Sequence, residues 1–184
     1  MNWGLFMSTS VVRRDKTREV VLCGLLTAMV FVSTRFINLR LPLSVNGGLI
    51  HMGNTMLFMI AIVFGKKRGA IAGALGMGLF DILSGWFLWA PFTALIRGTM
   101  GYIVGRAAEG KTGKQQIIYV LAGIVLSSLV MIGGYYITEG LLYGNWIAPM
   151  TSVPGNVIQL ILGAAIGVPL AEALKKTKIM DFNA

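Results

Sequence analysis

Polar and ionisable side chains stand inside otherwise apolar stretches of this chain, and their types are those that bind or protonate a small molecule. In chain order they are Arg35, His51, Asn54, Asp81, Ser84, Arg97, Glu139 and Asn156. Such groups are costly inside a membrane and are functional candidates by default. Trp89 and Tyr135 add flat rings on which a planar ligand can stack. Together these residues predict a mainly apolar pocket with a few placed polar groups.

The composition indicates that these stretches lie in lipid. Of the 184 residues, 55% are hydrophobic and only 12% are charged, whereas a soluble domain has about 25% charged residues. A soluble domain this small has too little interior to hide so much apolar surface. The net charge of +9 comes from short clusters between apolar runs, which favours cytoplasmic loops over nucleic-acid binding. We therefore expect an all-α membrane protein in a lipid bilayer, without a nucleic-acid partner.

Six stretches approach the length that crosses the hydrocarbon, roughly 17 to 25 residues. They are Glu19–Ile37, Leu49–Phe64, Gly69–Ala90, Pro91–Ala107, Gln116–Thr138 and Pro154–Leu174. The prediction is a compact bundle of six transmembrane helices over residues 19–174, after an N-terminal segment 1–18 and before a tail 175–184. The second and fourth stretches are the least regular, and a tilted or re-entrant segment is the alternative for each.

Lysine and arginine predict the orientation of the bundle. Basic residues gather before the first stretch, between the second and third, between the fourth and fifth, and in the tail. The loop 38–48 has only Arg40, and the loop 140–153 has none. Both termini are therefore expected in the cytoplasm. The basic N-terminal segment is not expected to be a cleavable signal peptide, because the apolar run after it is too long.

This topology puts most of the polar candidates in the outer half of the bundle, which indicates a pocket open to the outside rather than a channel. Asp81 and Arg97 flank one tight connection and are expected to pair, either as part of a site or as a buried bridge that only holds the hairpin. The alternative to a binding role for His51 is a polar residue at the membrane boundary. For Arg35 and Glu139 the alternative is that their side chains reach the lipid headgroups. An interfacial aromatic belt is the alternative for the tryptophans and tyrosines.

Small residues four apart form smooth helix faces for close contact. The pairs are Gly24 and Ala28, Gly69 and Gly73, Ala70 and Ala74, Ala72 and Gly76, Gly101 and Gly105, and Gly163 and Gly167. Packing inside the bundle accounts for most of them. A face that points outward would dock another membrane protein.

Catalysis and metal binding have weaker support. There is one cysteine, Cys23, and no zinc-type cluster or phosphate-binding Walker pattern. An intramembrane enzyme would have to use His51, Asp81 and Glu139, which show no catalytic spacing. A membrane scaffold without a small ligand is the remaining alternative.

Residues 47–105 resemble the substrate-binding S component of energy-coupling-factor vitamin transporters. The resemblance rests on Gly-Gly-Leu-Ile-His-Met-Gly-Asn-Thr at 47–55, Phe-Gly-Lys-Lys-Arg-Gly-Ala-Ile-Ala-Gly at 64–73, Phe-Asp-Ile-Leu-Ser-Gly-Trp at 80–86 and Trp-Ala-Pro-Phe-Thr at 89–93. It implies a subunit of the plasma membrane, expected to be bacterial, that takes up a vitamin from outside. It also implies a transmembrane coupling subunit and two cytoplasmic ATPases as partners. ATP is then bound by the partners, and no cofactor or metal is expected in this chain.

The resemblance also implies roles for single residues. Gly24 and Ala28 match the family's small-residue pattern that contacts the coupling subunit, although the family has alanine where Gly24 stands. The expected cargo is hydroxymethylpyrimidine, with pyridoxine second. Both are small flat rings with hydroxyl groups, which suits aromatic side chains together with Asn54, Asp81 and Asn156. Pantothenate is the next candidate, because Arg35, Arg40 or Arg97 would hold its carboxylate. The loop 38–48 is expected to cover the pocket.

Overall fold

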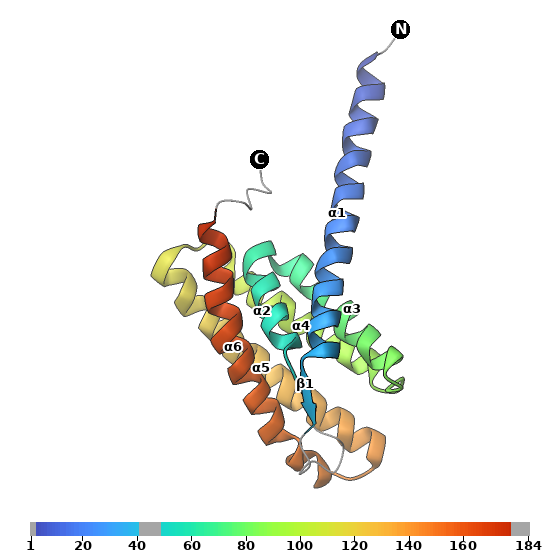
Figure 1. Cartoon of the computed structure of the whole chain (residues 1–184), viewed down its shortest axis with the longest axis vertical. Coiled ribbons are helices and arrows are strands. Elements are labelled where there is room, and N and C mark those ends of the chain that lie inside the picture. Colours follow the sequence, from blue (N-terminus) through green and yellow to red (C-terminus); the bar gives the residue numbers. More distant parts are fainter. Residues whose placement is uncertain (1–2, 41–48, 178–184) are drawn as a thin grey trace.

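Six helices build the chain in the computed structural model, which describes residues 3–40 and 49–177, with side chains described within 16–38 and 50–177. The helices are α1 (Trp3–Phe36), α2 (Gly53–Phe64), α3 (Lys66–Leu83), α4 (Ala90–Ala108), α5 (Gly113–Tyr143) and α6 (Val153–Lys176). The start of α1 and the end of α6 lie toward the same end of the molecule (Figure 1). The protein is an all-α membrane bundle, as the sequence predicts.

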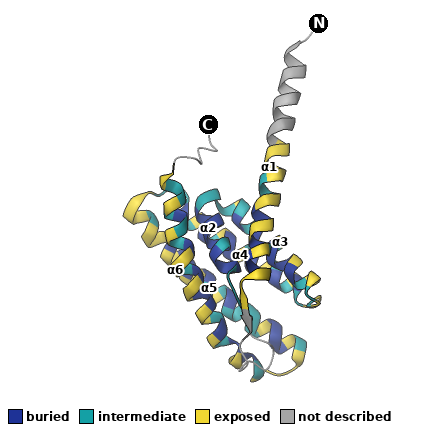
Figure 2. Cartoon of the chain, viewed as in Figure 1, coloured by how far each residue is buried: buried dark blue, intermediate teal, exposed yellow. Residues whose placement is uncertain are grey.

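Large apolar side chains are exposed on several helices, α3 among them, and three segments have the length of a membrane span. The segments Lys16–Phe36, Gly113–Tyr143 and Ala148–Lys176 are long and apolar enough to cross a membrane. Figure 2 shows exposed positions along these outer helices, and large apolar side chains such as Leu25, Leu129 and Ile161 are more than half exposed. In a bilayer, exposed leucine and isoleucine contact acyl chains, so this surface needs no protein cover.

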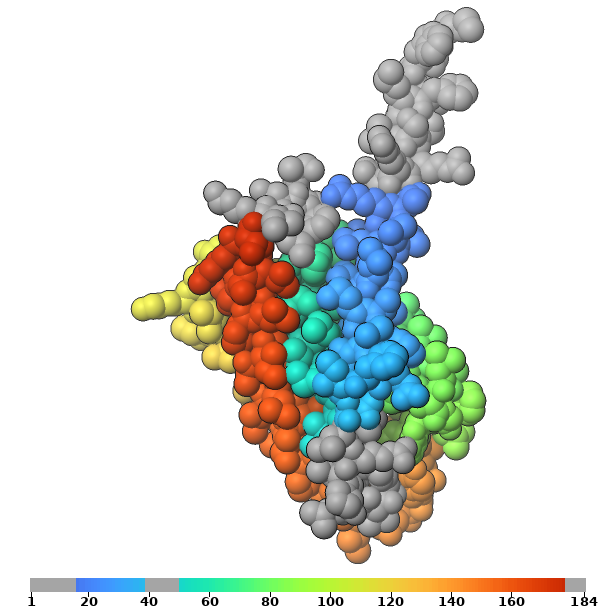
Figure 3. Space-filling model, viewed as in Figure 1, coloured from blue at the N-terminus to red at the C-terminus, as the bar shows by residue number. Residues whose placement is uncertain are grey.

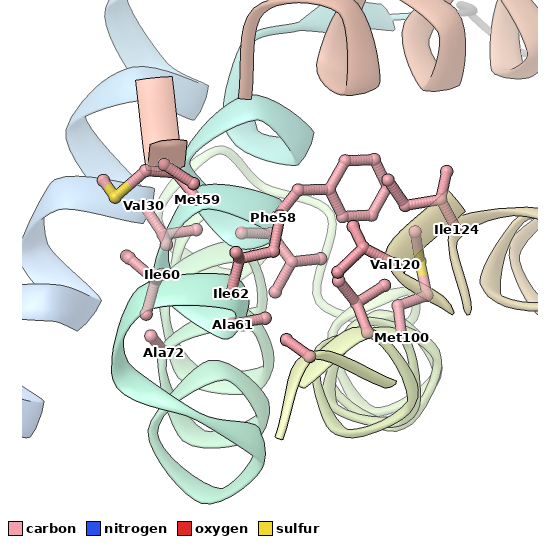
Figure 4. Packing of buried hydrophobic residues seen from close by; sticks show 14 of the residues in the cluster. Val30, Phe58, Met59, Ile60, Ala61, Ile62, Ala72, Met100, Val120 and Ile124 are labelled. Atoms are coloured by element: carbon pink, nitrogen blue, oxygen red, sulfur yellow. The ribbon is translucent and has the colours of Figure 1, made fainter. Parts of the chain in front are cut away.

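α2 is the enclosed element of the bundle. It has 12 residues, nine of them buried, and it lies between α1 and α6 on the face shown in Figure 3. Figure 4 shows Phe58 of α2 pointing toward Val120 and Ile124 of α5. At 1.5 Å per residue α2 spans roughly 18 Å, well short of a hydrocarbon core of about 30 Å. Its first residue therefore lies inside the bundle and not at the bundle's surface.

The predicted first stretch, Glu19–Ile37, agrees with the apolar span Lys16–Phe36, although α1 itself begins earlier, at Trp3. Other predicted boundaries are wrong. α2 begins at Gly53 and not at Leu49, because Leu49–His51 forms strand β2 and pairs antiparallel with β1 (Asn38–Arg40). α3 ends at Leu83, before Gly85 with its φ of +86°. A 3-10 turn at Ala148–Thr151, η1, precedes α6 and was not predicted. Residues 41–48 of the predicted covering loop lie outside the described residues.

Helices α3 and α4 approach each other through backbone. A Cβ on Gly101 would collide with the backbone of Gly69, and a Cβ on Gly105 with that of Lys66. These two glycines and Gly69 are therefore used for internal packing, as the spacing predicts. Close backbone contact of this kind leaves no room for even one methyl group.

The basic segments meet at the end of the bundle that carries the start of α1. Arg68 donates two hydrogen bonds to Glu19, at 2.6 and 2.9 Å. Lys66 pairs with Glu109 at 2.8 Å, and its hydrogen bond keeps the pKa of that carboxyl below the ordinary value. Lys175 donates to Gln116 at 2.8 Å. These contacts bring the described parts of the basic segments together at one end of the bundle, which the positive-inside rule predicts to be the cytoplasmic end.

We expect Gly101→Ala to lower the free energy of unfolding by about 2 kcal/mol or more, because the new methyl group collides with backbone that cannot rotate away. The matched control is Gly133→Ala on α5, where a Cβ meets nothing within 4 Å. Thermal unfolding in detergent measures both. Equal melting temperatures of the two variants would contradict the packing described here.

Candidate functional site: an outer cavity between helix ends

A cavity of about 480 Å³ opens at the end of the bundle opposite the basic end. The helix ends surround it: the last turns of α1, α3 and α5, the first turns of α4 and α6, and the strand residue His51 just before α2. Because α2 starts inside the bundle, the space beyond its first residue is left for the cavity. The volume lies in the range of about 300 to 1,000 Å³ that is usual for small-molecule sites.

Nine of the ten candidate binding residues lie on the wall of this one cavity. They are Arg35, His51, Asp81, Ser84, Trp89, Arg97, Tyr135, Glu139 and Asn156. The tenth, Asn54, is fully buried behind Arg97 and does not line the cavity. Their role in binding stays a prediction, but the sequence positions converge in space.

Arg97 is the most constrained polar group of the wall, with only 2% of its surface exposed. Its Nε donates to the Tyr135 hydroxyl at 3.1 Å, and its Nη1 donates to Asn54 Oδ1. Nη1 also lies 3.0 Å from the Met131 sulfur. Among the described residues Nη2 has no hydrogen-bond partner, so its two N–H groups are available to a ligand in the cavity.

The predicted direct pair of Asp81 with Arg97 is wrong. Within the described residues the ion pairs are Lys66–Glu109 and Arg68–Glu19, and Arg97 bonds instead to the neutral groups of Asn54 and Tyr135. The Thr93 hydroxyl hydrogen-bonds to the Asp81 carboxylate, and the positive charge of Arg97 acts on that carboxylate from beyond salt-bridge distance. Neutral partners fix the guanidinium without cancelling its charge, so Asp81 and Arg97 can both face a ligand.

His51 is held by backbone and by α6. The Gly53 N–H donates to His51 Nδ1 at 3.2 Å, so the neutral ring carries its proton on Nε2. The Gln159 side-chain amide nitrogen lies 3.2 Å from Nε2 and 3.3 Å from Nδ1, nearly equidistant from the two ring nitrogens. A Cβ on Gly53 would meet Nδ1 at 2.8 Å, so glycine is needed there. His51 is therefore a residue of the cavity wall whose ring is held in place by its neighbours.

Aromatic rings form a second wall around Trp89. Its ring centroid lies 6.4 Å from that of Trp86, 6.0 Å from that of Tyr135 and 6.2 Å from that of Tyr143. Trp86, Trp89 and Tyr135 line the cavity, whereas Tyr143 and Trp146 are about half exposed. The interfacial-belt interpretation fits the exposed Tyr143 and Trp146 best.

Among the described wall residues, basic and acidic side chains are equal in number. Arg35 and Arg97 oppose Asp81 and Glu139, and the Glu139 carboxylate accepts a hydrogen bond from the Ser152 hydroxyl at 3.0 Å. Glu139 is 4% exposed and lies within α5, so it does not reach the headgroups as an exposed helix end would. A wall with equal opposite charges suits a polar ligand without net charge better than an anion.

Sequence reasoning did not select several wall residues, among them Asn38, Phe80, Thr93 and Ser152. Helical spacing carries a signal for Thr93, which precedes Arg97 by four residues and therefore shares a helix face with it. Ser152 lies before α6 and Asn38 lies on a strand, so no helical period marks them.

The small-residue pair Gly24 and Ala28 points away from the bundle. Both residues are exposed on α1, and a Cβ on Gly24 would meet nothing within 4 Å. The pair is therefore not used for internal packing. No cluster of metal-ligating side chains occurs in the part of the chain that the structure describes.

We expect Asn54→Ala to lower the free energy of unfolding by about 1 to 3 kcal/mol, because the buried Arg97 guanidinium loses an acceptor that water cannot replace. Asn156→Ala is the matched control, since Asn156 lies on the wall but is only partly buried. It should change stability by less than about 0.5 kcal/mol. Thermal unfolding of the ligand-free chain measures both, and an equal effect would argue against the Asn54–Arg97 contact.

Comparison with known proteins agrees with this geometry. Residues 14–176 match the family of the ECF-type riboflavin transporter, S component. The chain is 28% identical over 164 residues to the thiamine precursor transporter HmpT of Lactococcus lactis subsp. cremoris (strain MG1363), covering 89% of this chain and 92% of that protein. It is 36% identical over 137 residues to an uncharacterized protein in the gap 3' region of Pyrococcus woesei, covering 74% and 89%. The chain therefore belongs to the S components of ECF-type transporters.

Proposed function

We propose that this chain captures a small, flat, uncharged vitamin or vitamin precursor in the outer cavity, with hydroxymethylpyrimidine as the first candidate. The observation that carries the proposal is the pairing of an aromatic wall with a charge-balanced polar wall in one cavity of about 480 Å³. An aromatic ring of the ligand would lie against Trp89. The similarity to a thiamine precursor transporter supports the same class of cargo.

Each polar group of the ligand then has a partner of the right kind. Arg97 Nη2 donates to a ring nitrogen or a hydroxyl oxygen. The carboxylates of Asp81 and Glu139 accept from an exocyclic amine or a hydroxyl group. Pyridoxine offers a similar ring and is the second candidate. Riboflavin is tested because the matching family carries its name, and pantothenate because it would place a carboxylate on an arginine.

The proposed mechanism uses no cofactor and no ATPase activity of this chain. ATP would be bound by two cytoplasmic ATPases, and a transmembrane coupling subunit would dock on α1 of this chain in the plasma membrane of a bacterial cell. Gly24 and Ala28 support that docking, because they are an exposed small-residue pair on a lipid-facing helix. An inward release of the cargo would follow from the docked state.

Ligand binding by the purified chain tests the cargo. We expect saturable binding of hydroxymethylpyrimidine with a change in tryptophan fluorescence, and a loss of affinity of about tenfold in Trp89→Ala, since a stacked ring contributes roughly 1 kcal/mol or more. Trp146→Ala is the control, because Trp146 lies outside the cavity wall. If pyridoxine, riboflavin, pantothenate or thiamine binds and hydroxymethylpyrimidine does not, the molecule that binds is the cargo. No saturable binding by a folded chain would favour the scaffold alternative, and turnover of a ligand would favour an enzyme.

Docking on the coupling subunit is tested separately. Gly24→Leu combined with Ala28→Leu should abolish co-purification with the coupling subunit and ATP-driven uptake, while ligand binding by the isolated chain persists. The leucines fill a face on which nothing in this chain packs, so the fold should survive. The control is Ala122→Leu with Gly133→Leu on α5, which places the same bulk on another outward-facing helix. Intact uptake in the α1 variant would exclude this face as the docking site.

A further inference from the structure

A second cavity, of about 430 Å³, lies at the basic end of the bundle, away from the proposed ligand site. Its apolar lining comes from Ile62, Val63 and Phe64 at the end of α2. Its charged lining is Arg68, Glu109, Lys111 and Lys175, from α3, the connection between α4 and α5, and the end of α6. Neither the candidate site nor the proposed docking face uses any of these residues.

Two of the four charges are already compensated. Arg68 is bound by Glu19 through both nitrogens that face it. Glu109 is held by Lys66, whose ammonium and backbone N–H reach the two carboxylate oxygens at 2.8 and 3.4 Å. In the described part of the chain neither Lys111 nor Lys175 has a carboxylate in salt-bridge range. Among the described residues the cavity therefore keeps two positive charges without an ion-pair partner, and the Glu172 carboxylate, three residues earlier on α6, acts on Lys175 only from beyond salt-bridge distance.

Both lysines are fixed beside the cavity. Lys175 Nζ donates to Gln116 Oε1 at 2.8 Å, and Gln116 Nε2 in turn donates to the Ala108 carbonyl at 2.8 Å. Lys111 Nζ lies 4.3 Å from the centroid of the Tyr119 ring and 3.5 Å from the Glu109 carbonyl oxygen. An ammonium group has three donors, so each lysine keeps hydrogen-bonding capacity for a ligand.

Capping of helix ends accounts for part of this arrangement, because Lys111 donates to the carbonyl of Glu109, the C-cap of α4, and Lys175 lies in the last turn of α6. Cations often lie at helix C-termini because they compensate free carbonyl groups. Here the Ala61 and Gly105 carbonyls at the ends of α2 and α4 accept from the Gly65 and Glu109 N–H groups. The Ala108 carbonyl accepts from Gln116, which stands between it and Lys175.

We propose that this second cavity binds a phosphate-bearing anion through Lys111 and Lys175. Oxygens of a phosphate group fit ammonium donors, and basic pockets between transmembrane helices on the cytoplasmic side bind anionic headgroups. The same chemistry is offered by a phospholipid headgroup and by free phosphate. The apolar side chains of Ile62, Val63 and Phe64 line the cavity beside the charged residues. They would contact the upper acyl-chain carbons of a phospholipid whose headgroup binds the lysines.

The test uses the full-length chain in neutral detergent, titrated with short-chain phosphatidylglycerol, with inorganic phosphate and with short-chain phosphatidylcholine. Bound molecules per protein are counted by native mass spectrometry. We expect saturable binding of phosphatidylglycerol or of phosphate, and little binding of phosphatidylcholine. Lys111→Gln with Lys175→Gln should lower the affinity about tenfold or more, since two charge-assisted hydrogen bonds are removed.

The matched control is Lys114→Gln with Lys176→Gln, which removes the same charge from two exposed lysines that do not line the cavity. It should lower the affinity by less than about threefold, through general screening only. Lys111→Arg with Lys175→Arg keeps the charge and should retain binding even if the glutamine pair folds poorly. Binding of phosphatidylglycerol alone identifies a lipid site, and binding of phosphate alone identifies a soluble anion. Equal losses in both glutamine pairs, loss in the arginine pair, or no saturable binding of either probe would overturn the proposal.

Discussion

The guanidinium of Arg97 is the group around which the outer half of the bundle is organised. A charge surrounded by lipid-facing helices is tolerated only when its hydrogen bonds are satisfied inside the protein. Asn54 supplies one acceptor from the first turn of α2, and Tyr135 supplies another from α5. The contact with Asn54 requires α2 to begin deep in the bundle, beside the middle of α4. The shortness of α2, the buried position of Asn54 and the open space beyond it thus follow from one requirement.

Close approach of the helices is the second requirement, and glycine meets it. A Cβ on Gly163 would lie 2.7 Å from Asn54 Cβ, and one on Gly73 would lie 2.9 Å from the Arg97 carbonyl oxygen. The residues that hold the buried charge therefore lie where α6 packs closely on α2 and where α3 packs closely on α4. A larger side chain at either glycine would therefore displace the residues that bind Arg97, whereas the lipid-facing surface is farther from the new atoms.

The sequence predicted which residues would converge but not how they would be bonded. Residue types and positive-inside topology were enough to bring nine candidates to one wall, because ends of helices on the same side of a membrane lie together. The partners of Arg97 were missed because Asn54 and Tyr135 lie 43 and 38 residues away in the chain, and no local period connects them. The strand pair at Asn38–Arg40 and Leu49–His51 was missed because its segments are three residues each, too short to show alternation.

Small-residue spacing shows most clearly where sequence information ends. Gly101 and Gly105 have the same spacing as Gly24 and Ala28, yet the first pair contacts the backbone of α3 and the second faces outward. The spacing predicts only that a helix has a smooth face. Whether that face packs against a neighbouring helix or points to the lipid depends on how the other helices are arranged. Because α1 uses Leu26 and Val30 for its internal contacts, its smooth face is left toward the lipid. A transmembrane partner can approach it there without disturbing the network that holds Arg97.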